Sequence, residues 1–535
     1  MKKIIVGLLI ATILCSALFT GCTNESASVD NGERITITVG YPKAEETWCD
    51  DDYFKYVTDK LGIDIEFVSL SADSAAEKAR IWISSGGMPD LVFTNFLMDE
   101  YIQYGEQEVV KTMPADWEEK YPNVGFSMAM TRILPELKEA GNGSIYGLVR
   151  PLDHYSNYLD EFRAAYAEGK DLTEMMLEQP YLYVDTYGFV YRKDWAKQLG
   201  IKTDYIMEYD DFIDMALKFK EADLGGVGEK NTIGVAVSYT EAPNIFVTAF
   251  NSSYKYFHKD ETGKYVCGLM EDSTTEGVMA FIDAYRKGVL ATDFYTQKSK
   301  DLNSLFCSQR SGIVFPKAEV SAFRQLRADF AKANPGVNVD EAMGVCWIKS
   351  PDGKIHGRES GNHNKVWYFN PDMSDEKLDK ILQLADYVSS PDGGKQIRLG
   401  LPGVDYDENY NQIGDLANGK SIADKYPSYT FFGTFLNPQY NMPVKPDPYA
   451  YQEFSNLSAA KKSNELSLLE WDAKRDFYVA EDYVKFNAAY EVNSMFAELV
   501  VTEGDPKELW EKKRKEMEKA AQSVADNMNK ALLGE

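Results

Sequence analysis

Alternating strand-like and helix-like patterns open the globular part of the chain. Residues 34–39 alternate isoleucine and valine with polar side chains, which predicts a strand. A helix-like stretch over 50–60 and a strand over 63–68 follow, and this order predicts a parallel pair. A helix over 72–85 and a short strand over 91–93 continue the alternation, which is typical of an α/β fold.

A parallel sheet binds ligands outside the carboxyl ends of its strands. The loops that begin at Gly40 and Thr94 are therefore the first places where a site is expected. This expectation depends only on the strand pattern.

Two later helices have clear end signals. Ser374 is the expected N-cap of the first, and Pro391 stands just beyond its end. Asp505, Pro506 and Glu508 form the N-terminal signature of the last helix. This helix either binds a partner or packs against its own domain, and the second alternative is favoured. The apolar positions on one face are Leu378, Ile381, Leu382, Ala385 and Val388 in the first helix, and Leu509, Met517, Val524 and Met528 in the second.

The N-terminus has the pattern of an export signal. Lys2 and Lys3 precede an apolar run over 4–19, which is at the short end for a transmembrane helix. The small residues before Cys22 resemble the lipobox of bacterial lipoproteins, in which the cysteine is acylated, although Phe19 replaces the usual leucine. We expect a lipoprotein signal peptide over 1–21 and a flexible tether over 22–33, with an ordinary signal peptide as the alternative.

Composition narrows the class of protein. The 535 residues are enough for two or more lobes, and 44% hydrophobic residues allow a large core. The chain has 57 basic and 84 acidic residues, and the net charge of −27 disfavours nucleic-acid binding. Cysteine and histidine do not have metal-like spacing, so neither a metal site nor a cofactor is expected. Free buried thiols are favoured over disulfides for Cys49, Cys267, Cys307 and Cys346.

Six separated motifs resemble one protein family. They are SSGGMPDLV at 84–92, GSIYGL at 143–148, YRKDW at 191–195 with LG at 199–200, YRKGVL at 285–290, SGIVF at 311–315 and GLPGVDY at 400–406. In this order they are similar to the extracellular solute-binding proteins of bacterial ABC importers, in the maltose-binding-protein-like group that binds sugars. The segment 221–231 lacks the alternating acidic residues of the calcium-like loop in many relatives, so calcium is not expected there.

The resemblance implies a two-lobed α/β fold of the periplasmic-binding-protein type (class II) with a ligand cleft between the lobes. The first lobe would comprise 34–150 and 312–368, and the second 151–311 and 369–535. Such a protein catalyses no reaction: it captures a carbohydrate, expected to be an oligosaccharide, by hinge closure. It then delivers the sugar to the permease of an ABC transporter, as a lipid-anchored monomer on the extracellular face of the bacterial membrane.

A sugar site needs aromatic platforms and planar polar groups. Each candidate also has a structural alternative, because aromatic residues mostly pack in cores, an Arg150–Asp153 pair could brace the hinge, and Asp405 and Tyr406 could form a turn. The ligand-binding candidates are Glu46, Trp48, Thr94, Asn95, Arg150, Asp153, His154, Trp347, Trp367, Asp405 and Tyr406.

Two other classes of function remain open at this point. A secreted glycan-active enzyme would share the acidic, aromatic-rich composition, but its two opposed carboxylates cannot be recognised among 84 acids. A surface sensor or adhesin could use the same fold without import. The identity of the sugar is not specified by these patterns.

Overall fold

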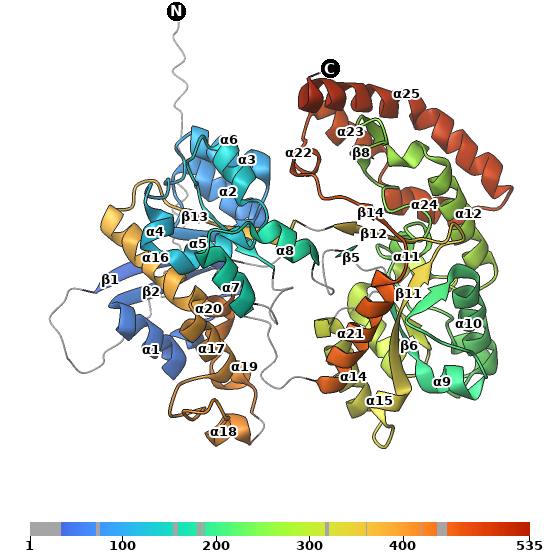
Figure 1. The fold of residues 1–535 in the computed structure, drawn as a ribbon, viewed down its shortest axis with the longest axis horizontal. Helices are drawn as coiled ribbons and strands as arrows, with labels where there is room; N and C mark the ends of the chain where they lie inside the picture. Colours follow the sequence, from blue (N-terminus) through green and yellow to red (C-terminus); the bar gives the residue numbers. More distant parts are fainter. Residues whose placement is uncertain are drawn as a thin grey trace, which may run out of the picture.

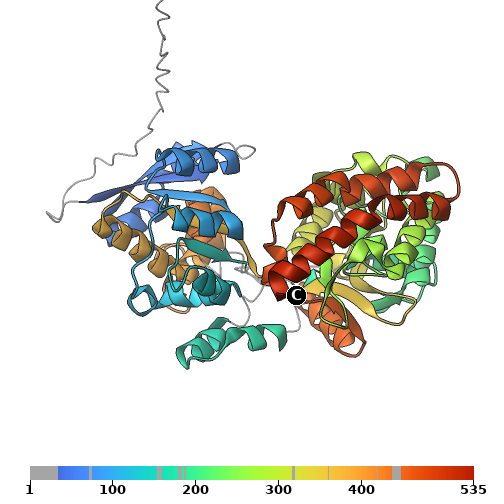
Figure 2. The same cartoon turned by 90° about the horizontal axis from the view of Figure 1, so that it is seen from above.

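The computed structural model describes residues 34–534, apart from 71–74, 153–158, 179–183, 186–187, 316–319, 360, 419 and 436–446. These residues form two α/β lobes that stand side by side in two perpendicular views (Figures 1 and 2). Among the described helices, none combines the length and the apolar character needed to span a membrane. The predicted signal peptide, the tether and the lipidation site Cys22 lie outside the described residues.

The first lobe is built on a five-stranded sheet with the order β2-β1-β3-β13-β4. Its strands are β1 (Ile35–Pro42), β2 (Ile63–Leu70), β3 (Leu91–Asn95), β4 (Leu148–Pro151) and β13 (His363–Phe369). β1 is parallel to β2 and β3, and α1 (Asp52–Leu61) and α2 (Ala75–Ser85) connect them. The predicted strand and helix order is confirmed. β13 runs antiparallel between β3 and β4.

Two helices follow β13 and belong to the first lobe. The side chain of Ser374 caps α16 (Asp375–Ser389) by accepting a hydrogen bond from the Lys377 N–H at 3.2 Å, and the five predicted core positions are buried. Pro391 does not simply follow the helix but opens the next one, α17 (Pro391–Leu399). Proline suits a first helical position because its missing N–H would have no partner there.

The second lobe contains a four-stranded sheet with the order β10-β6-β11-β7. Its strands are β6 (Phe189–Arg192), β7 (Ile206–Glu208), β10 (Ile313–Val314) and β11 (Met343–Lys349). The long helix α25 (Pro506–Leu533) lies at one end of this lobe (Figure 1), with Asp505 as its N-cap. Met517, Val524 and Met528 are buried in the core of the second lobe, and Leu509 is half-buried. The helix therefore packs against its own lobe.

The strand pairing divides the chain between the lobes differently from the expected ranges. The range 312–368 is expected in the first lobe, but β10 and β11 both pair with β6 in the second sheet. The range 369–535 is expected in the second lobe, but α16, α17 and α20 (Tyr429–Thr434) supply buried residues to the first core. Only the part of 312–368 that forms β13 joins the first sheet.

Three of the four cysteines that follow the predicted signal and lipidation site are free and buried, as expected. Cys267, Cys307 and Cys346 are free and buried, whereas Cys49 is disulfide-bonded and departs from the expectation. In the segment 221–231, the Asp223 carboxylate accepts hydrogen bonds from the Val227 and Gly228 N–H groups and from the Thr232 hydroxyl. These loop contacts occupy its oxygens.

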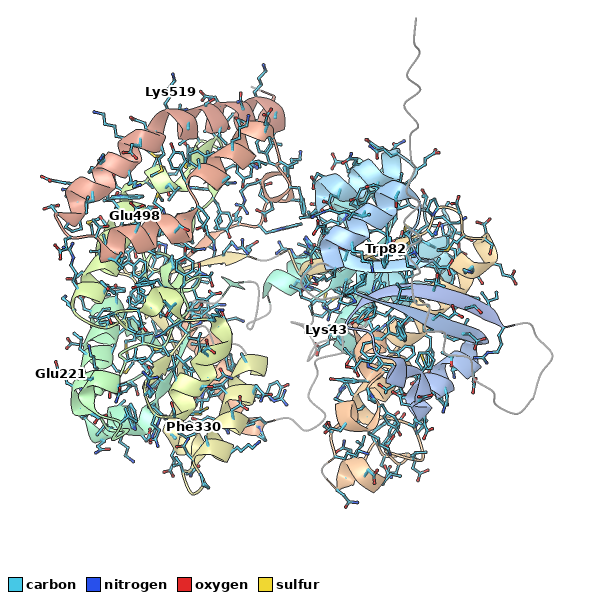
Figure 3. The ribbon with its side chains drawn as sticks, turned by 180° about the vertical axis from the view of Figure 1, so that it is seen from behind. Lys43, Trp82, Glu221, Phe330, Glu498 and Lys519 are labelled. Atoms are coloured by element: carbon cyan, nitrogen blue, oxygen red, sulfur yellow. The ribbon has the colours of Figure 1, made fainter. Side chains whose placement is uncertain are left out.

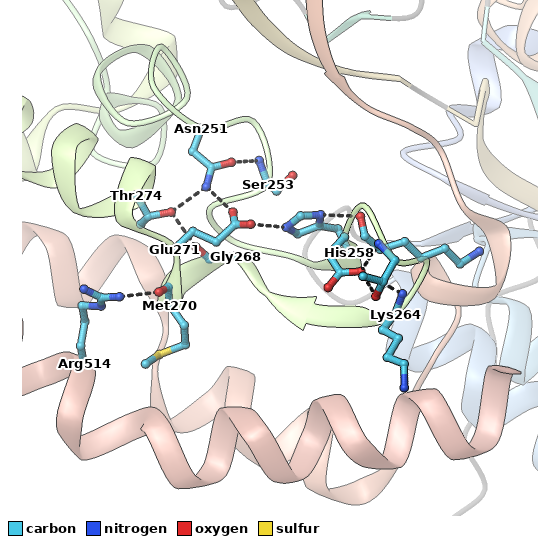
Figure 4. Close-up of polar contacts among 12 residues, drawn as sticks. Asn251, Ser253, His258, Lys264, Gly268, Met270, Glu271, Thr274 and Arg514 are labelled. Atoms are coloured by element: carbon cyan, nitrogen blue, oxygen red, sulfur yellow. Dashed lines mark hydrogen bonds and ion pairs between the residues drawn. The ribbon is translucent and has the colours of Figure 1, made fainter. Parts of the chain in front are cut away.

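A polar network ties β8 (Phe257–Lys259) to the start of α12 (Asp272–Arg286) in the second lobe (Figure 4). The Glu271 carboxylate lies 3.0 Å from His258 Nε2 and accepts a 2.6 Å hydrogen bond from the Asn251 amide. Burial opposes ionisation of Glu271, but the contacts with His258 and Asn251 outweigh it and lower the pKa of the carboxyl group. The charged form of Glu271 is therefore favoured by folding.

Replacing Glu271 with glutamine is expected to destabilise the protein by about 1–2 kcal/mol at pH 7, because charge-assisted hydrogen bonds are lost. The pKa of Glu271 is lower in the folded state, so its contribution exists above the unfolded pKa and disappears as the pH falls through the folded pKa. Urea unfolding of both proteins at pH 7 and in acid measures the difference. If the stability difference between the two proteins stayed the same in acid, the stabilising role of the Glu271 carboxylate would be contradicted.

Candidate ligand-binding site

A small sheet connects the lobes. It has the order β14-β12-β5 and consists of β5 (Val184–Asp185), β12 (Ile355–Glu359) and β14 (Leu466–Leu469). β12 of the second lobe is followed after three residues by β13 of the first. β13 begins at the edge of the first sheet where β1, β3 and β4 end, since it is antiparallel to β3 and β4. This edge therefore faces the second lobe, and Figure 3 shows Lys43, just after β1, on that side.

A row of three polar residues crosses the first sheet at this edge. Lys365 of β13 is paired with Asn95 of β3 on one side and with Arg150 of β4 on the other. Residues paired across neighbouring strands lie on the same face of a sheet. The Lys365 ammonium group donates a hydrogen bond to the side-chain oxygen of Asn95. Asn95 is exposed, and the two cations are half-buried.

The two cations of this row influence each other. Burial lowers the pKa of Lys365, and the positive charge of Arg150 lowers it further. Arg150 makes no hydrogen bond or ion pair with any described residue, and its Nε atom is buried without a partner. Close by, the Tyr41 hydroxyl is hydrogen-bonded to Thr434 at 2.6 Å, and its pKa is raised by burial. The row thus offers donors and positive charge but no carboxylate.

A second cluster holds the connection between β12 and β13. Arg132 lies 3.4 Å from Glu359 and 5.1 Å from the ring centroid of Trp471. The Trp471 N–H donates to Glu359 at 3.3 Å, and its ring lies against His363. Burial lowers the pKa of His363, so its ring is neutral near pH 7. At Gly361 a Cβ atom would lie 2.5 Å from the His363 ring, so the close packing requires glycine.

The second lobe contributes an aromatic residue near this hinge. Tyr256 accepts a hydrogen bond from Arg358 of β12, and the Arg358 guanidinium lies 5.0 Å from the centre of its ring. Arg475 lies 5.6 Å from the same ring and is paired with Asp476 at 2.8 Å. Tyr256 is half-buried.

The three tryptophan candidates lie inside their lobes. Trp367 is 0% exposed and packs against Tyr41 and Phe93 in the first core. Trp48 is buried in the same core, edge-on to Tyr41. Trp347 is 2% exposed in the second lobe, with Lys461 above its ring at 4.7 Å. The stacking role predicted for these residues is replaced by a packing role, because no ring face is open to a ligand.

Three further ligand-binding candidates, two polar and one aromatic, have a structural role instead. Thr94 is buried in β3. Asp405 is 0% exposed, accepts hydrogen bonds from the Leu401 N–H and the Tyr426 hydroxyl, and pairs with Lys425. Tyr406 is buried and stacks on a neighbouring tyrosine. The ligand-binding prediction for these residues gives way to the turn and core alternatives.

The remaining candidates divide into two groups. Asn95 and Arg150 lie together in the polar row and stay candidate ligand contacts. Asp153, His154 and the side chain of Glu46 lie outside the described residues. Sequence reasoning missed Lys365 and Trp471. The signal for Lys365 was present, since it is the last charged residue before the apolar run at the end of β13.

Comparisons with known proteins agree with this architecture. The model of the family described as bacterial extracellular solute-binding protein matches residues 50–316. A search of curated proteins found no match.

Three solved structures have a similar fold over almost the whole chain. An extracellular solute-binding protein from Bifidobacterium longum subsp. infantis has a TM-score of 0.60 and 15% identity, covering 92% of this chain and 97% of that chain. The alginate-binding protein AlgQ2 without calcium ion has a TM-score of 0.59 and 16% identity, covering 93% and 97%. The S. pneumoniae ABC-transporter substrate-binding protein FusA, as an EF-hand mutant in complex with fructo-nystose, has a TM-score of 0.58 and 17% identity, covering 94% and 100%.

The chain crosses repeatedly between two α/β lobes, and a polar edge of the first lobe faces the second. This architecture is that of a two-lobed binding protein of the periplasmic-binding-protein type. The chain belongs to the family of bacterial extracellular solute-binding proteins. This family and its structural neighbours are binding proteins rather than enzymes.

Proposed function

We propose that this protein captures a carbohydrate, an oligosaccharide in particular, between its lobes and delivers it to an ABC importer. The observation that carries the proposal is the fold, which matches those of AlgQ2, whose title names alginate, and of FusA, described with fructo-nystose, over more than nine tenths of this chain. In our proposal the protein is a monomer, held at the extracellular face of the membrane by a lipid on Cys22.

The mechanism is capture by closure. Asn95 and Arg150 on the first lobe offer planar polar groups that can form paired hydrogen bonds with sugar hydroxyls. Trp471 and Tyr256 supply aromatic surface near the connecting sheet. A ligand that contacts both lobes binds the closed form more tightly and shifts the population toward it. The closed pair of lobes is then the form that the permease recognises.

Thermal unfolding with a panel of oligosaccharides, monosaccharides, peptides and amino acids tests the proposal. A ligand at about 100 times its dissociation constant stabilises the protein by about 2.7 kcal/mol, which raises the melting temperature. We expect a shift with one glycan series, with the glycan recovered intact by mass spectrometry. Cleavage of the glycan would favour an enzyme, and a shift with peptides alone or with no compound would contradict carbohydrate capture.

A further inference from the structure

We infer that the captured saccharide is anionic and that Arg150 and Lys365 bind its carboxylate or sulfate group. This inference rests on the proposed function, and it specifies the chemical class of the ligand. It comes from the charge of the polar row at the edge of the first sheet.

The row places two positive charges on adjacent strands of one sheet face. Arg150 and Lys365 are directly paired across β4 and β13. Like charges in this position repel each other and destabilise the sheet. The repulsion is felt at Lys365, whose pKa is lowered by Arg150 in addition to burial.

No described carboxylate compensates these charges. Lys365 donates only to the neutral amide oxygen of Asn95 among the described residues, and Arg150 has neither an ion pair nor a hydrogen bond there. A half-buried cation without a counter-charge is costly. The chain has 84 acidic residues against 57 basic ones, yet no carboxylate of the described residues pairs with either cation.

Other arginines near the hinge show the contrast. Arg132 is paired with Glu359 at 3.4 Å, and Arg475 with Asp476 at 2.8 Å. Arg150 and Lys365, at the edge of the first sheet that faces the second lobe, have no such carboxylate partner among the described residues. A planar guanidinium matches a carboxylate or sulfate with two parallel hydrogen bonds, and the adjacent ammonium adds a point charge. An anionic ligand group would therefore supply the missing counter-charge.

The inference is tested by titration calorimetry with uronate, sulfated and neutral oligosaccharides of matched length. We expect the uronate or the sulfated series to bind at least tenfold more tightly than the neutral one, and the affinity to fall with rising salt. The two anionic series distinguish a carboxylate from a sulfate. Arg150→Gln and Lys365→Gln should each weaken binding at least tenfold while thermal unfolding shows a folded protein.

Asn95→Asp is the sharpest variant, because it changes no side-chain size and places a carboxylate beside Lys365. It should weaken binding of the anionic glycan without loss of stability. Lys519→Gln is the matched control, since Lys519 is exposed on α25 of the second lobe (Figure 3) and its removal changes the net charge equally.

Two results would overturn the inference. Neutral glycans that bind as tightly as the anionic ones, with unchanged affinity in Arg150→Gln and Asn95→Asp, would refute the anionic ligand and leave carbohydrate capture intact. Failure of every glycan to bind would refute carbohydrate capture, and the anionic ligand with it.

Discussion

Replacing Trp367 with alanine is expected to destabilise the protein by about 3–5 kcal/mol, the usual cost of removing a large aromatic side chain from a core. The indole is fully buried in the middle strand pair of the first sheet. Its ring centroid lies 4.5 Å from that of Phe93 and 4.6 Å from that of Phe435. Chemical unfolding monitored by circular dichroism measures the loss.

Trp367→Phe is the control for this prediction. The indole N–H has no hydrogen-bond partner among the described residues, so phenylalanine removes an unsatisfied group as well as volume. Its cost should be clearly smaller than that of alanine. If Trp367→Ala abolished ligand binding and left the unfolding curve unchanged, the core assignment would be wrong and the residue would be a ligand platform.

Asp405→Ala is expected to have an effect of similar size, about 3–5 kcal/mol, because it breaks a buried charge pair from one side. The carboxylate is fully buried and forms an ion pair with Lys425. It also accepts hydrogen bonds from the Tyr426 hydroxyl at 2.7 Å and from the Leu401 N–H at 2.7 Å. Removing it leaves all three donors without their acceptor. A thermal unfolding scan should show a large decrease in melting temperature.

Asp407→Ala provides a matched control in the same loop. Asp407 is half-buried and accepts hydrogen bonds only from residues within its own turn, Asn409 and Asn411, among the described residues. Its removal should cost much less than that of Asp405. Equal losses in the two variants would show that the loop as a whole, rather than the buried pair, determines stability.

Local patterns predicted the parts of the fold that depend on local physics. The sequence predicts the first strands and helices, the Ser374 cap and the buried face of α25. These features depend on hydrophobic periodicity and helix capping, which involve residues close together in the sequence. The expectation that a site lies at the carboxyl edge of the first sheet depends on strand direction alone, and it stays a prediction.

Pairings between distant residues could not be read in this way. Trp367 looks like a sugar platform until α20, far along the chain, places Phe431 against its ring. Trp48 looks the same until Tyr41 and Phe67 are seen to pack against it. The sequence from β10 to β13 shows no domain-boundary signal, so the boundary expected at residue 312 lies too early. Lys365 stands out only once β13 is known to lie between β3 and β4.

The position of β13 also governs the order in which the chain can fold. Among the described strands, β4 has no hydrogen-bonded neighbour in the first sheet other than β13, which is synthesised only after most of the second lobe. Residues 148–151 must therefore wait for residue 363 before their backbone groups are paired, a long-range closure that makes folding slow. A growing chain that stops short of residue 363 leaves the edges of β3 and β4 in the first sheet unpaired with β13. Completion of the first sheet thus depends on a strand from the second half of the sequence.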